Sequence, residues 1–188
     1  MKKKFLGLAI VVLFFWMVLV PAAVFAQTLN LSMVQPGDIL LGRNPNAMHA
    51  WNNASYYTHA ALVVSKNMTI ETLGNNFPNN TVQGYSITNW INWFKSGLFT
   101  RVVILRVDTS EANRKTALLK AYGEYGKTYS IFPFKNSTMT KHSCCSLVWY
   151  AYRYSPSGID LDYNGGSYIV PDDIALDNDI KYVSIQGY

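Results

Sequence analysis

Cysteine and charged side chains are scarce in this sequence of 188 residues. Its two cysteines, Cys144 and Cys145, are adjacent, and adjacent cysteines rarely form an unstrained disulfide with each other. This excludes a small domain stabilised by several disulfides. Asp, Glu, Lys and Arg make up 14% of the residues, against about 25% in a typical soluble domain. Hydrophobic residues reach 49%, which excludes a disordered chain.

Most of the formal charge of +5 comes from lysines at the start of the chain. Lys2, Lys3 and Lys4 supply three of these charges, and without them the formal charge falls to +2. The remaining chain has no block of Lys and Arg that would follow a phosphate backbone. We therefore expect no nucleic-acid partner.

The first 26 residues have the order of a secretory signal. The three lysines precede an apolar run over residues 5–20, and a stretch of small residues ends at Ala26, where we expect cleavage. The alternative is an uncleaved membrane anchor, because residues 5–26 exceed the roughly 20 residues that span a bilayer. Under either interpretation we expect a secreted or membrane-anchored protein outside the cytoplasm.

Residues 27–188 contain no repeat or low-complexity linker, and their pattern predicts one α+β domain. Apolar and β-branched runs predict strands, the second and third of which form a hairpin. Ser110 is a candidate helix N-cap, and helical spacing of apolar residues predicts a helix after it and another beginning at Cys144. The expected strands are 39–42, 58–64, 69–73, 101–107 and an edge strand at 181–185, the helices follow 110, span 144–154 and lie near 170–174, and the loops are 43–57, 74–84 and 129–141.

Cys144 lies in the first turn of its predicted helix. The helix dipole and the unpaired backbone N–H groups at that end favour a thiolate and can stabilise an oxyanion on an acyl substrate. Such a position predicts a nucleophile, although cysteine is also a common buried residue.

A nucleophilic thiol needs a base, and the sequence offers only His49, His59 and His142. We favour His59, because it begins an otherwise apolar strand in which an imidazole needs a polar partner. Glu71 lies on the strand predicted to pair with it and is a candidate to orient the imidazole. We expect His142 to be solvated in a polar loop, and nothing in the pattern around His49 assigns it a role.

Four segments then carry a resemblance to a known family: 37–41 (GDILL), 58–64 (THAALVV) with Ile70-Glu71, 144–151 (CCSLVWYA), and 160–166 with 170–174 (VPDDI). In this order the chain resembles the circularly permuted papain-like hydrolases, the YiiX/YycO-like relatives of the NlpC cell-wall peptidases, which are akin to lecithin retinol acyltransferases. The resemblance covers nearly the whole chain after the first 26 residues.

The resemblance implies a papain-like fold, with an antiparallel sheet packed against two or more helices, and no cofactor. It implies that Cys144 is the nucleophile, His59 the general base and Glu71 the third polar member of a triad. Cys145 stands where the family has a serine, and the following Ser-Leu-Val-Trp sets the register in favour of Cys144.

The expected function is a cysteine hydrolase that cleaves an amide bond, in cell-wall or other peptides, through a thioester. A lipid-directed acyl hydrolase or acyltransferase is the enzymatic alternative. Four aromatic residues would suit an acyl or membrane-facing groove, but we prefer to interpret them as an ordinary aromatic core: Trp90, Trp93, Phe94 and Phe99. A non-catalytic extracytoplasmic binding module is the other alternative. A zinc site is disfavoured because paired ligand spacings are missing.

Overall fold

The computed structural model describes residues 28–47, 55–74, 80–132, 134–136 and 138–188. The predicted signal or anchor segment and His49 lie outside these residues. In the described part of the chain, no helix combines the length and apolar character needed to cross a membrane.

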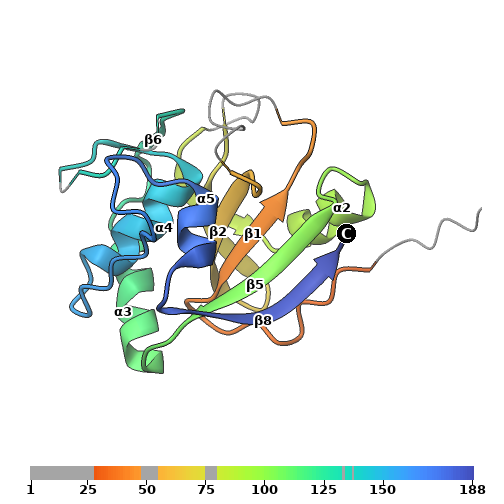
Figure 1. Ribbon diagram of the computed structural model, residues 1–188, viewed down its shortest axis with the longest axis horizontal. Helices are drawn as coiled ribbons and strands as arrows, with labels where there is room; N and C mark the ends of the chain where they lie inside the picture. The colour runs from red at the N-terminus through yellow and green to blue at the C-terminus, as the bar shows by residue number, and fades with distance from the viewer. Residues whose placement is uncertain (1–27, 48–54, 75–79, 133, 137) are drawn as a thin grey trace, which may run out of the picture.

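A six-stranded antiparallel sheet forms the centre of the molecule, with strand order β4-β3-β2-β1-β5-β8 (Figure 1). The strands are β1 (Ile39–Arg43), β2 (His59–Ser65), β3 (Met68–Thr72), β4 (Val82–Ser86), β5 (Arg101–Val107) and β8 (Ile180–Gly187). Two short strands, β6 (Thr128–Tyr129) and β7 (Lys141–His142), pair in parallel outside this sheet. The predicted α+β class with an antiparallel sheet is confirmed.

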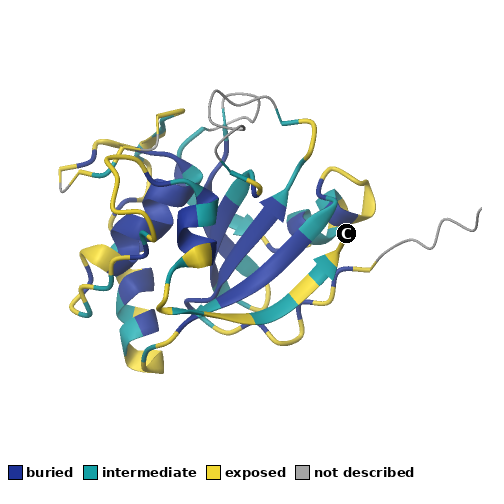
Figure 2. Cartoon of the chain, viewed as in Figure 1, coloured by how far each residue is buried: buried dark blue, intermediate teal, exposed yellow. Residues whose placement is uncertain are grey.

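Alternation along the strands divides the apolar core between the two faces of the sheet, because successive strand residues point to opposite sides. On one face, the cluster containing Ile39 and Val103 packs against α3 (Glu111–Tyr122), α4 (Cys144–Arg153) and α5 (Pro171–Leu176). On the other, the cluster containing Leu40 and Ile104 packs against α2 (Thr88–Lys95). The central strands are therefore buried on both sides (Figure 2).

The elements predicted from apolar periodicity are found close to their expected positions, and one loop was predicted wrongly. Residues 74–84 were assigned to a single loop, whereas β4 begins at Val82 and pairs with β3. This strand lies at the sheet edge and only Val82 within it is buried, so it lacks the apolar run that identifies a central strand.

Gly37 occupies the predicted turn before β1 and requires the absence of a side chain. Its φ is +87°, in the left-handed region that glycine adopts without steric cost. A Cβ on this residue would lie 2.5 Å from Cβ of Arg114 on α3. The turn and the helix thus approach each other more closely than two side chains allow.

We expect Gly37→Ala to destabilise the fold more than Gly97→Ala. Gly97 also has a positive φ, of +75°, but a Cβ there meets nothing within 4 Å, so its substitution costs only the left-handed backbone term of about 1–2 kcal/mol. Gly37→Ala adds an overpacking cost of about 1–3 kcal/mol. Urea unfolding of both variants measures the difference, and equal losses of stability would show that the turn does not constrain α3.

Candidate active site

The N-terminus of α4 is closed by a reciprocal pair of serine hydrogen bonds. The Ser146 backbone N–H donates to Oγ of Ser143 at 3.1 Å, and the Ser143 backbone N–H donates to Oγ of Ser146 at 2.8 Å. This capping box fixes the first turn of the helix. Cys144 is the first residue of that turn, as predicted, and is partly exposed.

The three residues singled out in the sequence come together at the end of β2. Nε2 of His59 lies 2.5 Å from Oε2 of Glu71, whose side chain is fully buried. His59 also hydrogen-bonds to Cys144. Since Nε2 is engaged by Glu71, the ring nitrogen left for the thiol is Nδ1. The order Cys144, His59, Glu71 has the geometry of nucleophile, base and orienting group.

Glu71 is held by two further donors that the sequence analysis did not identify. The Thr69 hydroxyl donates to Oε1 at 2.6 Å, and the Trp90 indole N–H donates to the same oxygen at 3.1 Å. Thr69 precedes Glu71 by two residues and so shares its face of the strand, a signal that alternation could have provided. Trp90 lies on α2, for which no element was predicted, and no pattern in the sequence indicates its contact with Glu71.

Aromatic rings surround the imidazole of His59. The ring centroids of Trp90, Trp93 and Phe99 lie 5.5, 6.3 and 6.2 Å from that of His59. Trp90 and Phe99 are buried, as is Phe94, so the preferred interpretation of these residues as aromatic core is confirmed for these three. Trp93 is partly buried against the same cluster.

The hydrogen bonds at the site favour a thiolate and an imidazolium. The pKa of Cys144 is held well below its ordinary value, chiefly by its interaction with Cys145, with further contributions from His59 and the Ala60 backbone N–H, against an opposing effect of burial. Burial on its own lowers the pKa of His59, but hydrogen bonds with Cys144 and Glu71 outweigh it and raise that pKa to about 10. The lowered pKa of Cys144 and the raised pKa of His59 together favour a thiolate–imidazolium ion pair.

Cys145 differs from its neighbour in exposure and in partners. Its side chain points into the protein and is 3% exposed, with Sγ 2.7 Å from the carbonyl oxygen of Ile169 and 3.3 Å from Oγ of Ser143. Burial raises the pKa of this thiol. The one S–H of Cys145 is thus directed at the Ile169 carbonyl oxygen, and of the two thiols only Cys144 is partly exposed and has a lowered pKa.

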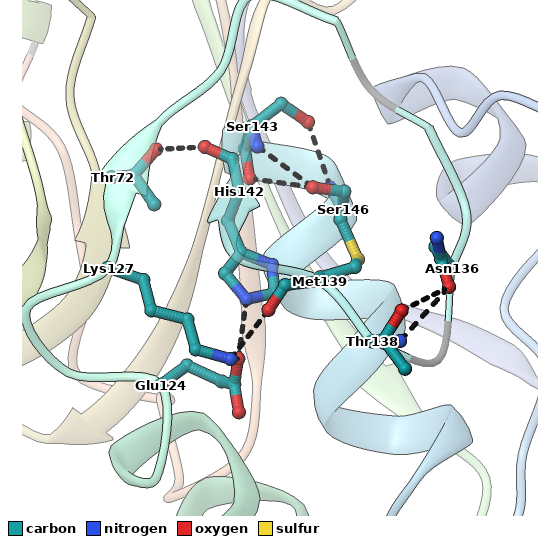
Figure 3. A network of polar contacts seen from close by, with 9 residues as sticks. All are labelled: Thr72, Glu124, Lys127, Asn136, Thr138, Met139, His142, Ser143 and Ser146. Carbon is teal, nitrogen blue, oxygen red and sulfur yellow. Dashed lines mark hydrogen bonds and ion pairs between the residues drawn. The ribbon is translucent and has the colours of Figure 1, made fainter.

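The segment that leads into α4 is anchored by a network of polar contacts around His142 and Glu124 (Figure 3). Nε2 of His142 lies 2.7 Å from Oε2 of Glu124, and Lys127 bridges the same carboxylate and the Met139 carbonyl oxygen. The Thr72 hydroxyl donates to the His142 carbonyl oxygen at 3.3 Å. These contacts tie the loop before Cys144 to the end of α3 and to β3.

The expectation that His142 is solvated was wrong. Its side chain is fully buried, and burial lowers the pKa of the imidazole. Sequence inspection places it in a polar loop, but β7 and the Glu124 carboxylate supply the partners that make burial possible. Among the described residues no group of three His, Cys, Asp or Glu side chains is arranged to hold a metal ion.

Comparison with known proteins supports the same assignment of fold. Residues 33–164 match the model of a family described as permuted papain-like amidase enzymes, YaeF/YiiX, C92 family. The crystal structure of metalloprotein yiiX from Escherichia coli O157:H7 is similar, with a TM-score of 0.62 at 18% identity, over 82% of this chain and 98% of that one. The comparison with curated proteins found no match.

We expect Glu71→Gln to lower the pKa of His59 from about 10 toward the ordinary value of 6.5, because the variant removes the negative charge that stabilises the imidazolium. The imidazolium would then be lost at a lower pH than in the wild type. NMR titration of the His59 ring measures this shift. Glu111→Gln, on the exposed surface of α3, is the control. An unchanged His59 pKa in Glu71→Gln would mean that the carboxylate does not set the charge of the imidazole.

Proposed function

The chain belongs to the permuted papain-like amidase family of YaeF and YiiX, and on that basis we propose that it hydrolyses amide bonds through a Cys144-His59-Glu71 triad. Membership of this family makes the chain a papain-like hydrolase. The observation that carries the assignment of roles is the continuous contact from Cys144 through His59 to the buried Glu71. Retention of the nucleophile, base and orienting group favours an enzyme over a binding module on the same fold.

In the proposed reaction, the Cys144 thiolate attacks the amide carbonyl carbon and forms a tetrahedral intermediate. Backbone N–H groups at the start of α4 are suited to stabilise its oxyanion. The His59 imidazolium gives its proton to the leaving amine as the C–N bond breaks, which leaves a thioester on Cys144. Neutral His59 then takes a proton from water, and the hydroxide attacks the thioester. Collapse of this second intermediate breaks the C–S bond and gives the Cys144 thiolate, the imidazolium and a carboxylic acid, which loses its proton to solvent, so the resting ion pair is restored.

Glu71 acts in this scheme without entering a covalent step. Its Oε2 fixes the ring of His59 with Nδ1 toward the sulfur, while Thr69 and Trp90 fix the carboxylate itself. A fully buried carboxylate with three donors cannot rotate away without leaving unpaired polar groups. The proposed role of Glu71 is therefore to hold the base and to stabilise its charged form.

We propose that the substrate is a peptide of the cell wall or a related amide, encountered outside the cytoplasm. The location rests on the order of the first 26 residues, which is that of a secretory signal or anchor.

N-terminal sequencing of the protein recovered from outside the cytoplasm should begin at Gln27 if the signal is cleaved. A protein that retains residues 1–26 and stays with the membrane would support the anchor, whereas recovery in the cytoplasm would contradict both.

We expect Cys144→Ser to lose at least about 1,000-fold in amide hydrolysis, because it removes the nucleophile. Cys145→Ser should retain most of the activity, since the serine hydroxyl also donates a hydrogen bond. The measurement is release of amine from cell-wall peptides, with detergent-dispersed lipid esters assayed in parallel. Intact mass spectrometry of acid-quenched samples locates the acyl group on Cys144. Acylation of Cys145 would overturn the assignment, and activity confined to lipid esters would contradict the peptide preference.

A further inference from the structure

Two arginines lie side by side at the end of the sheet where the active site is found. Arg43 ends β1 and Arg101 begins β5, and the two residues are direct partners in the antiparallel ladder. Both guanidinium groups approach the ring of Tyr56, with Cζ of Arg43 at 3.8 Å and Cζ of Arg101 at 5.7 Å from its centroid. The aromatic ring thus gathers two positive charges at one place.

Neither of these guanidinium groups has an acidic partner in the part of the chain that the structure describes. The ion pairs found there include Arg106 with Asp38 and Arg153 with Asp160, but none that involves Arg43 or Arg101. In addition, Nε of Arg101 is buried and has no hydrogen-bond partner. A buried donor without an acceptor is costly, so the guanidinium of Arg101 is incompletely paired within the protein.

The segment that carries Tyr56 is held by an acidic side chain from α5. Asp172 accepts hydrogen bonds from the backbone N–H groups of Tyr56 and Tyr57 at 2.5 and 2.9 Å. It thereby orders the segment that carries the Tyr56 ring. Burial, with the nearby Tyr182, raises the pKa of Tyr57 to about 12, and the positive charge of Arg101 opposes this rise. Arg101 is therefore close enough to act on groups around the Tyr57 hydroxyl.

The arginine pair shares a sheet face with Cys144. Arg43 continues the alternation of Ile39 and Leu41, whose cluster Cys144 packs against. Its neighbour Gly42 is the ladder partner of His59. Because adjacent strands are about 5 Å apart, β1 and β5 place the two arginines roughly 5 and 10 Å to one side of the strand that carries the base.

We propose that Arg43 and Arg101 form a subsite that binds a carboxylate of the amide substrate beside the scissile bond. This inference rests on the proposed function and narrows the substrate to amides that carry a negative charge on one side of that bond. The forked N–H donors of a guanidinium match the two oxygens of a carboxylate, and the pair supplies two such forks. Charge selectivity would then come from strands β1 and β5, separate from the residues that perform the chemistry.

The test compares two reactive probes that differ only in charge: an N-chloroacetyl dipeptide with a free C-terminal carboxylate, and the same dipeptide with a C-terminal carboxamide. The rate of Cys144 alkylation by each probe is followed by intact mass. We expect the wild type to prefer the carboxylate probe about tenfold or more, and Arg101→Gln and Arg43→Gln each to reduce that preference about tenfold. The rate with the carboxamide probe should stay constant, which also reports that each variant is folded.

Two further variants separate the subsite from general electrostatics. Lys66→Gln removes a positive charge in the exposed β2–β3 turn, and we expect it to change the preference by less than about twofold. Arg101→Lys keeps the charge but loses the fork, and should recover only part of the preference. If Arg101→Gln and Lys66→Gln have equal effects, or if the wild type shows no preference, the subsite is refuted.

A binding measurement distinguishes failure of the subsite from failure of the proposed function. Calorimetric titration of Cys144→Ala with N-acetylglycylglycine and with its C-terminal amide requires no reaction. Tighter binding of the carboxylate form that is lost in Cys144→Ala/Arg101→Gln supports the subsite even if neither probe alkylates Cys144 in the wild type. That combination would overturn the hydrolase mechanism alone, whereas equal binding of the two ligands would overturn the subsite.

Discussion

The buried carboxylate of Glu71 constrains the arrangement of the whole site. A charged group without exposure is tolerated only where donors surround it, and Glu71 has them in His59, Thr69 and Trp90. These donors come from β2, β3 and α2, so the position of the carboxylate depends on the hairpin and on the helix that covers it. Once Glu71 is held, the ring of His59 has one available orientation, and its second nitrogen faces the N-terminus of α4.

The nucleophile and the groups that orient the base lie on opposite faces of the sheet. The base and its supporting aromatic rings pack with the α2 side, whereas Cys144 belongs to the cluster on the α4 side. They meet at the end of β2, where the ladder with β3 has not yet begun and the Ala60 backbone N–H is turned toward the thiol. The network of His142, Glu124 and Lys127 holds the segment that precedes Cys144. A thiolate and an imidazolium are thus brought together by rigid elements.

The sequence predicted those parts of the structure that depend on local pattern. Apolar and β-branched runs located β1, β2, β3 and β5, and Ser110 was correctly identified as an N-cap, since its side chain accepts a hydrogen bond from the Asn113 backbone. The same reasoning, strengthened by the family resemblance, singled out the three side chains that the structure brings into contact. Residues 1–26 lie outside the described residues, so the signal or anchor stays a prediction.

What the sequence did not predict depends on long-range contacts. The β4 strand is polar at the sheet edge, and nothing local distinguishes it from a loop. The contact of Trp90 with Glu71 joins residues 19 positions apart on different elements, and the burial of His142 depends on a carboxylate at the end of α3. The pairing of Arg43 with Arg101 likewise follows from strand register, which the sequence pattern did not supply.

The central claim is that Cys144 is a thiolate stabilised by the His59 imidazolium, and the pH dependence of its alkylation by iodoacetamide tests this most directly. The ion pair predicts that Cys144 in the wild type reacts at a nearly constant rate from well below pH 8 upward, and that in His59→Ala the rise in rate shifts to higher pH, because the imidazolium no longer stabilises the thiolate. A wild-type profile that coincides with that of His59→Ala would contradict it.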